Sequence, residues 1–262
     1  INFPDAAFRQ YIVDNADVSP KDNCLSQQEA DAVTDINVDK LGISSIKGIE
    51  FFANLKELSC GYNNLSSLDI SKNINLMGLD CRFNSLTTLD VSKNIGLKFL
   101  CCGSNNLKAL DVSKNINLND LWCWHNNLTS LNLENNKALG MISVHTQIRT
   151  VTNFPNNTHV LKFADFNPNI DPNKIINIQG AKLDIANRAF TNVIPGTDIK
   201  YDYICDIDPY RDFMDVTIKL VSTPIINPPK TGDNSNLALY IMLLTMSLIV
   251  LSVFYMKAKK KK

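Results

Sequence analysis

Apolar residues recur at a fixed spacing through the middle of the chain. Residues 55–138 hold four successive copies of a 21-residue pattern, L-x-x-L-x-C-x-x-N-x-L-x-x-L-(D/N)-(I/V/L) with five further positions. A weaker copy occupies residues 33–54, and another follows at residues 139–151. A unit this short cannot bury its own apolar side chains, whereas stacked copies bury them against one another. The period therefore predicts a solenoid of about six repeats.

The pattern resembles the leucine-rich repeat, with cysteine in place of its usual third leucine. We expect positions 1, 4 and 6 to face inward from a short strand and its approach, and positions 11 and 14 to fill the rest of the core. The resemblance implies an α+β repeat solenoid, the leucine-rich repeat horseshoe, with a short parallel β-sheet and about six repeats of 21–22 residues.

An asparagine recurs at position 9, where the chain bends after the strand. A short amide side chain hydrogen-bonds backbone groups that a bend leaves without partners. We therefore expect a structural role, and no ligand, for these residues, which are Asn63, Asn84, Asn105 and Asn126.

Four of the seven cysteines recur at position 6: Cys60, Cys81, Cys102 and Cys123. Neighbouring strands lie about 4.8 Å apart, and disulfides span Cα separations of about 4.4–6.8 Å. Three roles are therefore possible for these cysteines: disulfide bonds, metal binding, or packing as small buried apolar side chains. The odd total and the lack of a C-x-x-C spacing favour the buried role. Cys101 occupies an outward position beside this column, and we expect it to be a reactive thiol.

Positions 3, 5 and 7 point outward, with positions 2 and 8 at the strand edges, and line the concave face on which such solenoids bind partners. Aromatic and charged residues gather there, as they do at protein interfaces. The candidate ligand-binding residues are Tyr62, Arg82, Phe83, Phe99, Asp120, Trp122, Trp124 and His125, with Glu57 and Asp80 among them. A protein partner is favoured over a glycan, which aromatic rings also bind by stacking. The alternative is that some rings only cover neighbouring strands or the C-terminal domain.

Two histidines, His125 and His145, come from adjacent repeats. They are close enough in the pattern to approach each other, but two ligands alone do not favour a metal site.

Residues 1–32 are predicted to form a helical cap over the first repeat. Phe8, Tyr11 and Ile12 have the spacing of one helix face. Ser26 and Glu29 have the spacing of a capping box, which begins a second helix.

The loop between these helices resembles the second half of an EF-hand. Asp22, Ser26 and Glu29 match its ligand positions, which makes them a weak calcium candidate. Val18 and Pro20 stand where that motif requires carboxylate ligands. We therefore expect an EF-hand-like cap that binds neither metal nor cofactor.

Residues 33–152 are assigned to the repeats, and residues 153–221 to a small β domain, because alternating segments with Gly- or Pro-containing breaks follow the last repeat. The chain shows no nucleophile, base and acid in a catalytic arrangement and no phosphate-binding glycine loop. We expect a protein that is not an enzyme.

Residues 237–256 carry no charge over 20 positions. At about 1.5 Å per residue this length matches a hydrocarbon core of about 30 Å. The lysine-rich residues 257–262 would remain cytoplasmic. We therefore predict a linker over residues 222–236, a transmembrane segment over 237–256 and a cytoplasmic basic tail.

The residues before this segment are Pro228, Pro229, Lys230, Thr231 and Gly232. Followed by a polar spacer, the apolar run and the basic end, they resemble the LPXTG-type sorting signal of Gram-positive cell-wall proteins, with Pro228 in place of leucine. The resemblance implies that a sortase cleaves after Thr231 and joins Thr231 to peptidoglycan. The apolar segment would then hold the precursor in the membrane only until cleavage.

Cap, repeats and sorting signal together resemble internalin-like leucine-rich repeat surface proteins of Firmicutes. The resemblance implies a secreted protein on the cell wall, made from a single-pass membrane precursor, that binds a protein through its concave face and serves in adhesion. The alternatives are a glycan-binding or wall-organising protein, or one module of a larger secreted enzyme. The chain begins at Ile1 without a secretion signal, so we expect a processed or truncated form.

The charge balance bears on the partners. Lys and Arg number 26, as do Asp and Glu; residues 232–262 hold five lysines and one aspartate, which leaves 21 basic against 25 acidic residues in the rest. Nucleic-acid binding requires a basic surface. We therefore expect sortase, peptidoglycan and an unidentified protein as partners, and no nucleic acid.

Overall fold

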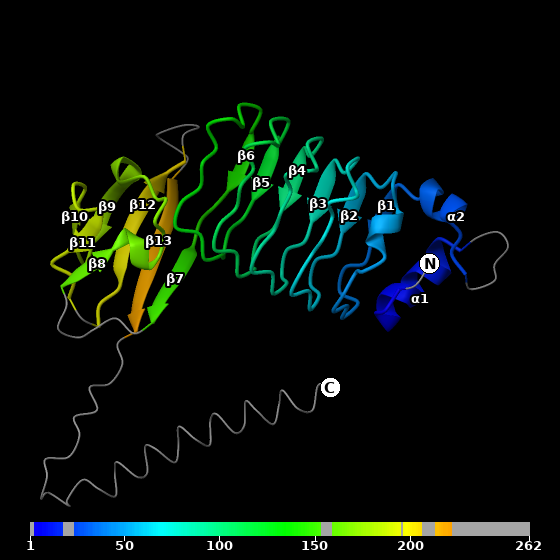
Figure 1. The fold of residues 1–262 in the computed structure, drawn as a ribbon, viewed down its shortest axis with the longest axis horizontal. Helices are drawn as coiled ribbons and strands as arrows, with labels where there is room; N and C mark the ends of the chain where they lie inside the picture. The colour runs from blue at the N-terminus through cyan, green and yellow to red at the C-terminus, as the bar shows by residue number, and fades with distance from the viewer. Residues whose placement is uncertain (1–2, 18–23, 153–158, 195, 206–212, 222–262) are drawn as a thin grey trace, which may run out of the picture. The chain divides into compact units, whose positions relative to one another are not determined.

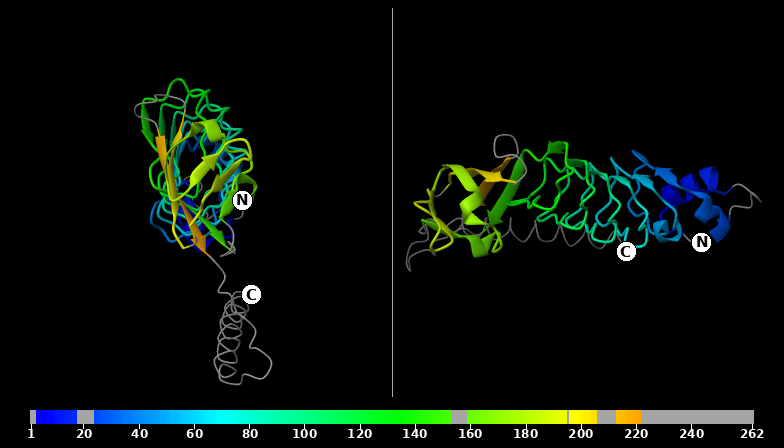
Figure 2. Two further views of the ribbon diagram at one scale, coloured as in Figure 1. Left: turned by 90° about the vertical axis from the view of Figure 1, so that its left-hand side faces the viewer. Right: turned by 90° about the horizontal axis from the view of Figure 1, so that it is seen from above.

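The computed structural model describes residues 3–17, 24–152, 159–194, 196–205 and 213–221. These residues all lie in one compact unit, residues 1–223. Within that unit, short strands stack between an N-terminal pair of helices and two C-terminal sheets (Figures 1 and 2).

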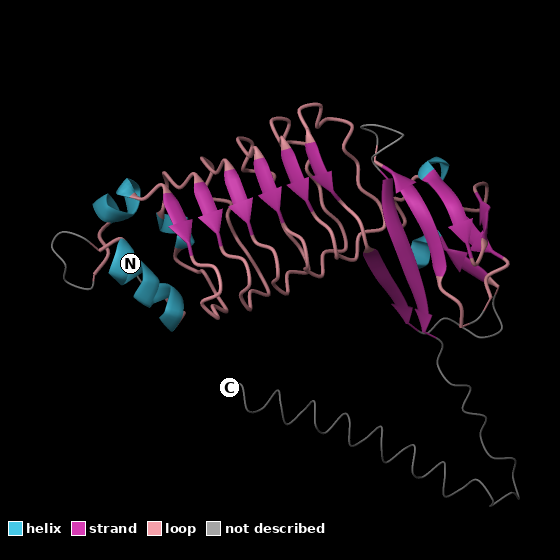
Figure 3. Ribbon diagram, turned by 180° about the vertical axis from the view of Figure 1, so that it is seen from behind, coloured by secondary structure: helices cyan, strands magenta, loops and turns pink. Residues whose placement is uncertain are grey.

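The repeats form a parallel β-solenoid of about five turns. Each contributes a strand of three residues, and the strands lie in register in one six-stranded sheet with loops on the other side (Figure 3). Their bounds are β1 Asp35–Asn37, β2 Glu57–Ser59, β3 Gly78–Asp80, β4 Phe99–Cys101, β5 Asp120–Trp122 and β6 Met141–Ser143. The solenoid and its parallel sheet are therefore as the repeat period predicts.

The core follows the pattern position by position. In the four full repeats, positions 1, 4, 6 and 11 are at most 2% exposed. Position 14 is less completely covered, since Leu68 is only partly buried and Leu89 is 8% exposed. The apolar residue at position 16 is also buried, as Ile70 and Val112 illustrate.

The predicted asparagine column bonds the bends of successive repeats together. The Asn84 side-chain amide donates to the carbonyl oxygens of Cys60 at 3.0 Å and Cys81 at 3.1 Å, while its oxygen accepts from the Leu65 N–H at 2.9 Å. In the last repeat Gln147 takes the same place and accepts from the Leu128 N–H at 3.1 Å. Each amide thus links two repeats, which confirms the predicted structural role.

A second asparagine ladder lies on the opposite side of the core, at position 19. Its members are Asn73, Asn94, Asn115 and Asn136, all fully buried. The Asn115 amide donates to the carbonyl oxygens of Val91 at 3.1 Å and Asn94 at 2.8 Å. The sequence signal for it is the recurring Ser-Lys-Asn, which the prediction did not use.

Position 8 adopts a left-handed backbone in every repeat. Tyr62, Phe83 and His125 have φ values of 55°, 52° and 49°, and the equivalent residues Lys40 and Thr146 are also left-handed. Non-glycine residues seldom adopt this conformation. The bend after each strand is therefore made by the backbone of position 8 and held by the amide at position 9.

Two helices cover the N-terminal end, α1 Ala6–Asn15 and α2 Gln27–Ala32, with the 3₁₀ turn η1 Ile49–Phe51 in the first repeat. Asp5 caps α1 by accepting from the Ala7 and Phe8 N–H groups, both at 3.0 Å. Phe3 and Phe8 pack edge to face with ring centroids 5.4 Å apart, and Phe8 is fully buried.

The capping box of α2 forms as its spacing predicts. The Glu29 carboxylate accepts from the Ser26 N–H at 2.9 Å and its hydroxyl at 2.7 Å. Asp22, the third residue of the calcium candidate, lies outside the described residues. Among those that are described, no three His, Cys, Asp or Glu side chains are grouped to hold a metal ion.

The C-terminal part consists of a four-stranded and a three-stranded sheet. The four-stranded order is β7-β13-β12-β9, with β7 parallel to β13, and the other order is β10-β11-β8. The bounds are β7 Gln147–Thr152, β8 Val160–Lys162, β9 Ile175–Gln179, β10 Lys182–Asp184, β11 Ala189–Thr191, β12 Ile199–Ile204 and β13 Phe213–Val221, with 3₁₀ turns η2 Phe163–Asp165 and η3 Pro172–Lys174. The buried Tyr201 hydroxyl donates to the Thr129 carbonyl at 3.1 Å, which ties this part to the last full repeat.

In the ranges that the structure describes, no helix has the length and apolar character to cross a membrane. The predicted linker, transmembrane segment and basic tail, residues 222–262, lie outside those ranges, as do all five residues of the sorting motif.

Candidate binding face of the six-stranded sheet

We call the exposed side of β1–β6, with the adjoining residues at positions 7 and 8, the strand face. Tyr62 and Phe83 stack on it with ring centroids 4.4 Å apart and 17° between their planes. The Lys40 ammonium lies 5.0 Å from the centroid of the Tyr62 ring. Tyr62 and Phe83 are each 39% exposed, so large apolar surface remains open to solvent beside a cation.

This row of rings continues to Trp124, which passes over a glycine. A Cβ atom at Gly103 would lie 2.6 Å from the Trp124 indole, so glycine there is what allows the indole to lie flat on the sheet. Trp124 contacts Phe83 edge to face at 5.4 Å and His125 at 5.2 Å. The rings of three repeats thus form one continuous surface.

A second aromatic pair lies along the middle of the strands. Phe99 and Trp122 pack edge to face with centroids 5.6 Å apart. Beside them, Trp122, Trp124 and residues 140–143 line an open hollow with a cavity volume of about 550 Å³. Met141, at its rim, is 54% exposed. We call this the aromatic hollow.

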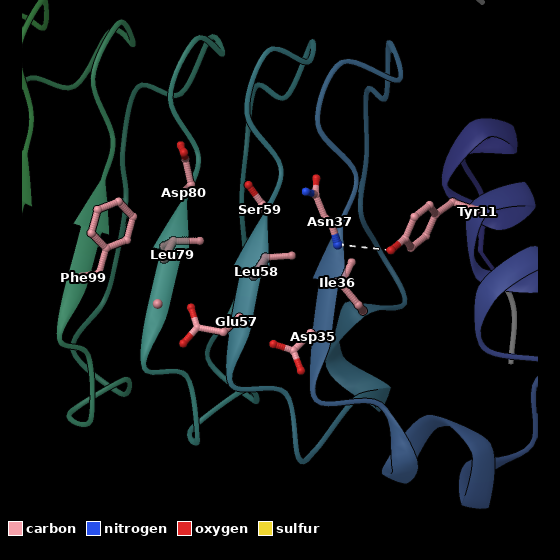
Figure 4. A pocket seen from close by; sticks show the side chains of 11 residues that line it. Tyr11, Asp35, Ile36, Asn37, Glu57, Leu58, Ser59, Leu79, Asp80 and Phe99 are labelled. Atoms are coloured by element: carbon pink, nitrogen blue, oxygen red, sulfur yellow. Dashed lines mark hydrogen bonds between the residues drawn. The ribbon is translucent and has the colours of Figure 1, made fainter.

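The N-terminal half of the strand face carries carboxylates instead. A hollow of about 440 Å³ is lined by residues of β1–β4 and by Tyr11 of α1 (Figure 4). Glu57 and Asp35 lie on neighbouring strands within it. Burial, and then the Asp35 charge, raise the pKa of Glu57. The Glu57 carboxylate lies over Gly78, where any Cβ would collide with it.

Asp80, which also lines this hollow, is paired with Arg82. The Arg82 Nε lies 3.2 Å from the Asp80 Oδ2, and the guanidinium lies 5.6 Å from the centroid of the Tyr62 ring. Burial raises the pKa of Asp80, against the lowering effect of the Arg82 N–H and charge.

The predicted binding residues therefore share one face of one sheet. Tyr62, Phe83 and His125 are exposed at its edge, whereas Arg82, Phe99, Asp120, Trp122 and Trp124 are half-buried within it. Ring contacts join Tyr62, Phe83, Trp124 and His125 into one row and Phe99 with Trp122 into a pair. Their role in ligand binding stays a prediction.

Three contributors to this face were missing from the prediction. Met141 falls at outward position 3, but in the weaker final copy of the repeat. Lys40 falls at position 8 of the weaker first copy. Gly103 is visible only as a small residue at position 7, and its importance depends on the indole that lies over it.

The prediction of a reactive thiol at Cys101 is wrong. Its side chain is fully buried although it points to the strand face. The paired positions on the neighbouring strands are occupied by the larger Asp80 and Trp122, which cover the short thiol. Burial and then the Asp80 carboxylate raise the pKa of Cys101 to about 12, so the nucleophilic thiolate is scarce at neutral pH.

The four column cysteines are fully buried, and no disulfide joins them. Burial raises the pKa of each thiol above its ordinary value of 9.0. They pack as small apolar side chains, the role that the sequence favours.

The two histidines of adjacent repeats are joined through their backbones, since the His125 backbone N–H donates to the His145 carbonyl at 3.2 Å. The His145 ring instead lies 3.4 Å from the Asp215 carboxylate.

These features define the class of the molecule: a leucine-rich repeat solenoid with an exposed aromatic strand face. No family model matches the chain, and no curated protein sequence matches it. The chain does resemble solved structures of internalins and internalin-like proteins of Listeria monocytogenes.

Internalin F of that organism is 24% identical, with a TM-score of 0.49, over 56% of this chain and 44% of that chain. This chain therefore spans less than half the length of that structure. The functional domain of InlJ, described as including a cysteine ladder, is 15% identical with a TM-score of 0.35, over 83% and 97% of the two chains. An internalin-like protein of the same organism is 13% identical with a TM-score of 0.34, over 83% and 96%.

Proposed function

We propose that this chain is a non-enzymatic module that binds a protein partner through its strand face. The observation that carries the proposal is the continuous row of exposed and half-buried rings from Tyr62 to His125, beside the aromatic hollow. A contiguous exposed apolar surface is costly in water and marks interaction sites. Aromatic anchors with charges at the margin are typical of protein interfaces.

The ring geometry supports a protein over a glycan. Sugars bind aromatic residues by stacking on ring faces. Tyr62 and Phe83 cover each other's faces at 4.4 Å, and Lys40 lies over the Tyr62 ring. Such rings offer mainly their edges to a ligand, which suits the irregular apolar contacts of a protein surface.

The test is a binding measurement on the double variant Trp122→Ala, Trp124→Ala. A partner is first captured from a protein extract with the wild-type chain and identified. The double variant is then expected to lower its affinity at least tenfold, by about 1.4 kcal/mol or more. Unchanged affinity in a folded variant would disprove binding through this face.

A matched control removes exposed apolar side chains elsewhere. Ile74 and Ile95 are 57% and 60% exposed at position 20, away from the strand face. The double variant Ile74→Ala, Ile95→Ala should leave the affinity unchanged. Glycan-array binding that depends on Trp122 and Trp124, without any protein partner, would favour the glycan-binding alternative instead.

The proposal extends to display on a Gram-positive cell wall, in adhesion, with Thr231 as the attachment point. It is supported by the sequence order of motif, apolar run and lysines alone. Mass spectrometry of wall digests is expected to find Thr231 joined to a peptidoglycan stem. A Thr231→Ala variant should remain uncleaved, and a mature wild-type chain that keeps residues 237–262 would disprove sorting.

A further inference from the structure

Among the residues that the structure describes, no strand pairs with the outer edge of β6, the last strand of the six-stranded sheet. In each full repeat the N–H at position 6 donates to the next strand at 2.8 Å, and the series ends with Cys123 bonding Ser143. Val144 is the next member. Within the described ranges, the structure records no acceptor for its N–H and no donor for the Gly140 carbonyl, which continues a series of paired carbonyls.

Side-chain burial shows the same open end. The residues at positions 1 and 4 are at most 2% exposed in all four full repeats, but Leu139 and Ile142 in the last repeat are only partly buried. The Val144 side chain is 2% exposed. Because an unpaired N–H in a buried residue is unfavourable, the edge would be stabilised by a further strand.

At one point of this edge, the C-terminal part supplies the hydrogen-bond acceptor that a further repeat would otherwise supply. The Thr146 N–H, which corresponds to N–H groups that bond the next repeat, instead donates to the Asp215 carboxylate at 2.8 Å. This bond lies beyond the end of β6, and among the described residues none pairs with the outer side of residues 140–144. These same residues, from Gly140 to Ser143, line the aromatic hollow with both tryptophans.

We propose that the partner inserts an extended segment that pairs with β6 and extends the sheet from six strands to seven. Alternating backbone donors and acceptors bind an extended chain whatever its sequence. Side chains on one side of the segment would cover Leu139 and Ile142, and those on the other would enter the aromatic hollow. The segment is therefore apolar at alternate positions and lacks proline where it pairs.

This inference rests on the proposed function, because it takes the occupant to be part of a protein. The probe is a synthetic peptide with the sequence of residues 139–147, LGMISVHTQ, which carries the spacing needed to stack on the last repeat. The readout is hydrogen exchange of backbone amides in the full chain, with and without about 1 mM peptide.

Peptide is expected to slow exchange of the Ile142 and Val144 amides at least tenfold. The Leu121 and Cys123 amides, which already face a neighbouring strand, should exchange slowly in both samples. Absence of protection at Ile142 and Val144, or protection spread evenly over the chain, would overturn the proposal.

Two variant pairs sharpen the test. The peptide is N-methylated either at residues 141 and 143 or at residues 142 and 144, and only one of these sets should abolish binding, since alternate amides face the edge.

In the protein, Ile142→Pro removes an outward N–H, while the matched Ile142→Ala variant keeps it. Peptide binding should be lost in the first and retained in the second. Equal behaviour of the two peptides would contradict pairing.

The outcomes separate this inference from the proposed function. Loss of partner binding on tryptophan substitution, without edge protection, would keep the function and overturn the strand addition. If peptide protects the edge but the partner binds the tryptophan variant with unchanged affinity, the strand addition is kept and binding through the strand face is overturned. Protection of Ile142 and Val144 that rises with the protein's own concentration would show that a second copy occupies the edge, and would overturn the proposal.

Discussion

The two ends of the solenoid differ in how completely their apolar core is covered. At the N-terminal end, α1 and α2 cover the core: Ile36 of β1 is 2% exposed, and the Tyr11 hydroxyl accepts from the Asn37 N–H at 3.2 Å. At the C-terminal end, the four-stranded sheet bonds to the last full repeat through Tyr201, yet Ile142 of β6 stays partly exposed. The first end is sealed, whereas the second is anchored but open along its strand.

The difference separates the end whose buried area stabilises the fold from the end at which we propose that a partner binds. A sealed end adds buried apolar area, which stabilises the folded state. An open strand edge beside exposed rings contributes less to stability and leaves groups available to a partner. The hollows follow the same division, with carboxylates near β1 and tryptophans near β6.

The largest expected effect is loss of the N-terminal seal. Phe8→Ala removes a fully buried ring that packs on Phe3, and we expect a loss of about 3–5 kcal/mol in the free energy of unfolding. Urea unfolding measures it, with exposed Gln10→Ala as the control. A loss below about 1 kcal/mol would show that α1 is not part of the stable core.

The next comparison concerns position 1 of the pattern in two successive repeats. Leu118 is fully buried, whereas Leu139, one repeat later, is partly buried. Leu118→Ala should cost about 2–5 kcal/mol in the free energy of unfolding. Leu139→Ala should cost clearly less, because the Leu139 side chain buries less apolar surface on folding. Equal losses by urea unfolding would contradict an open C-terminal end.

A smaller effect concerns the bond that anchors the C-terminal sheets. Tyr201→Phe removes the hydroxyl that donates to the Thr129 carbonyl and leaves the ring in place. We expect a loss of about 1–2 kcal/mol, since a buried acceptor is left unpaired. Tyr62→Phe, whose ring is 39% exposed, is the control for loss of a solvent-exposed tyrosine hydroxyl. A thermal unfolding midpoint that does not differ between the two variants would contradict this anchor.

The smallest effect depends on pH. Burial acts to raise the pKa of Asp5, but N–H donors from Phe8, Ser44, Ser45 and Ala7 outweigh it and lower the pKa below its ordinary 3.8. The unfolded chain therefore takes up the proton first on acidification, so this stabilisation is present above pH 3.8 and lost as the pH falls through the folded pKa.

Asp5→Asn keeps one acceptor oxygen for the cap but loses the charge and the second oxygen, which accepts from the Ser44 and Ser45 N–H groups. We expect a cost of about 1 kcal/mol at neutral pH. The difference in unfolding free energy between wild type and variant should shrink on acidification below pH 3.8. A difference that is constant with pH would show that the charge contributes nothing.

Much of the fold was predictable because the repeat couples each position to one environment. The inward leucines, the cysteine column, the asparagine at position 9 and the Ser26–Glu29 capping box all lie as their spacing predicts. The second asparagine ladder was missed although Ser-Lys-Asn recurs, because an amide in a polar stretch is as easily placed on the surface.

The binding face was predictable in location and less so in detail. Register alone places Trp122 and Trp124 on the outward side. It does not reveal that Gly103 lets Trp124 lie across to Phe83, because that contact joins repeats two apart. The error at Cys101 has the same origin. The outward direction of its side chain follows from register, but its exposure to solvent depends on the size of the side chains on the neighbouring strands.

The sequence by itself thus determined the solenoid, its inward and outward positions and the capping box of α2, since period and local hydrogen bonding depend on nearby residues in the chain. The tertiary structure decided which outward side chains cover one another, that Cys101 is buried and that no other described strand pairs with the outer edge of β6. Those outcomes depend on residues from different repeats meeting in space, and the one-dimensional pattern does not specify how neighbouring side chains share the surface or where pairing stops.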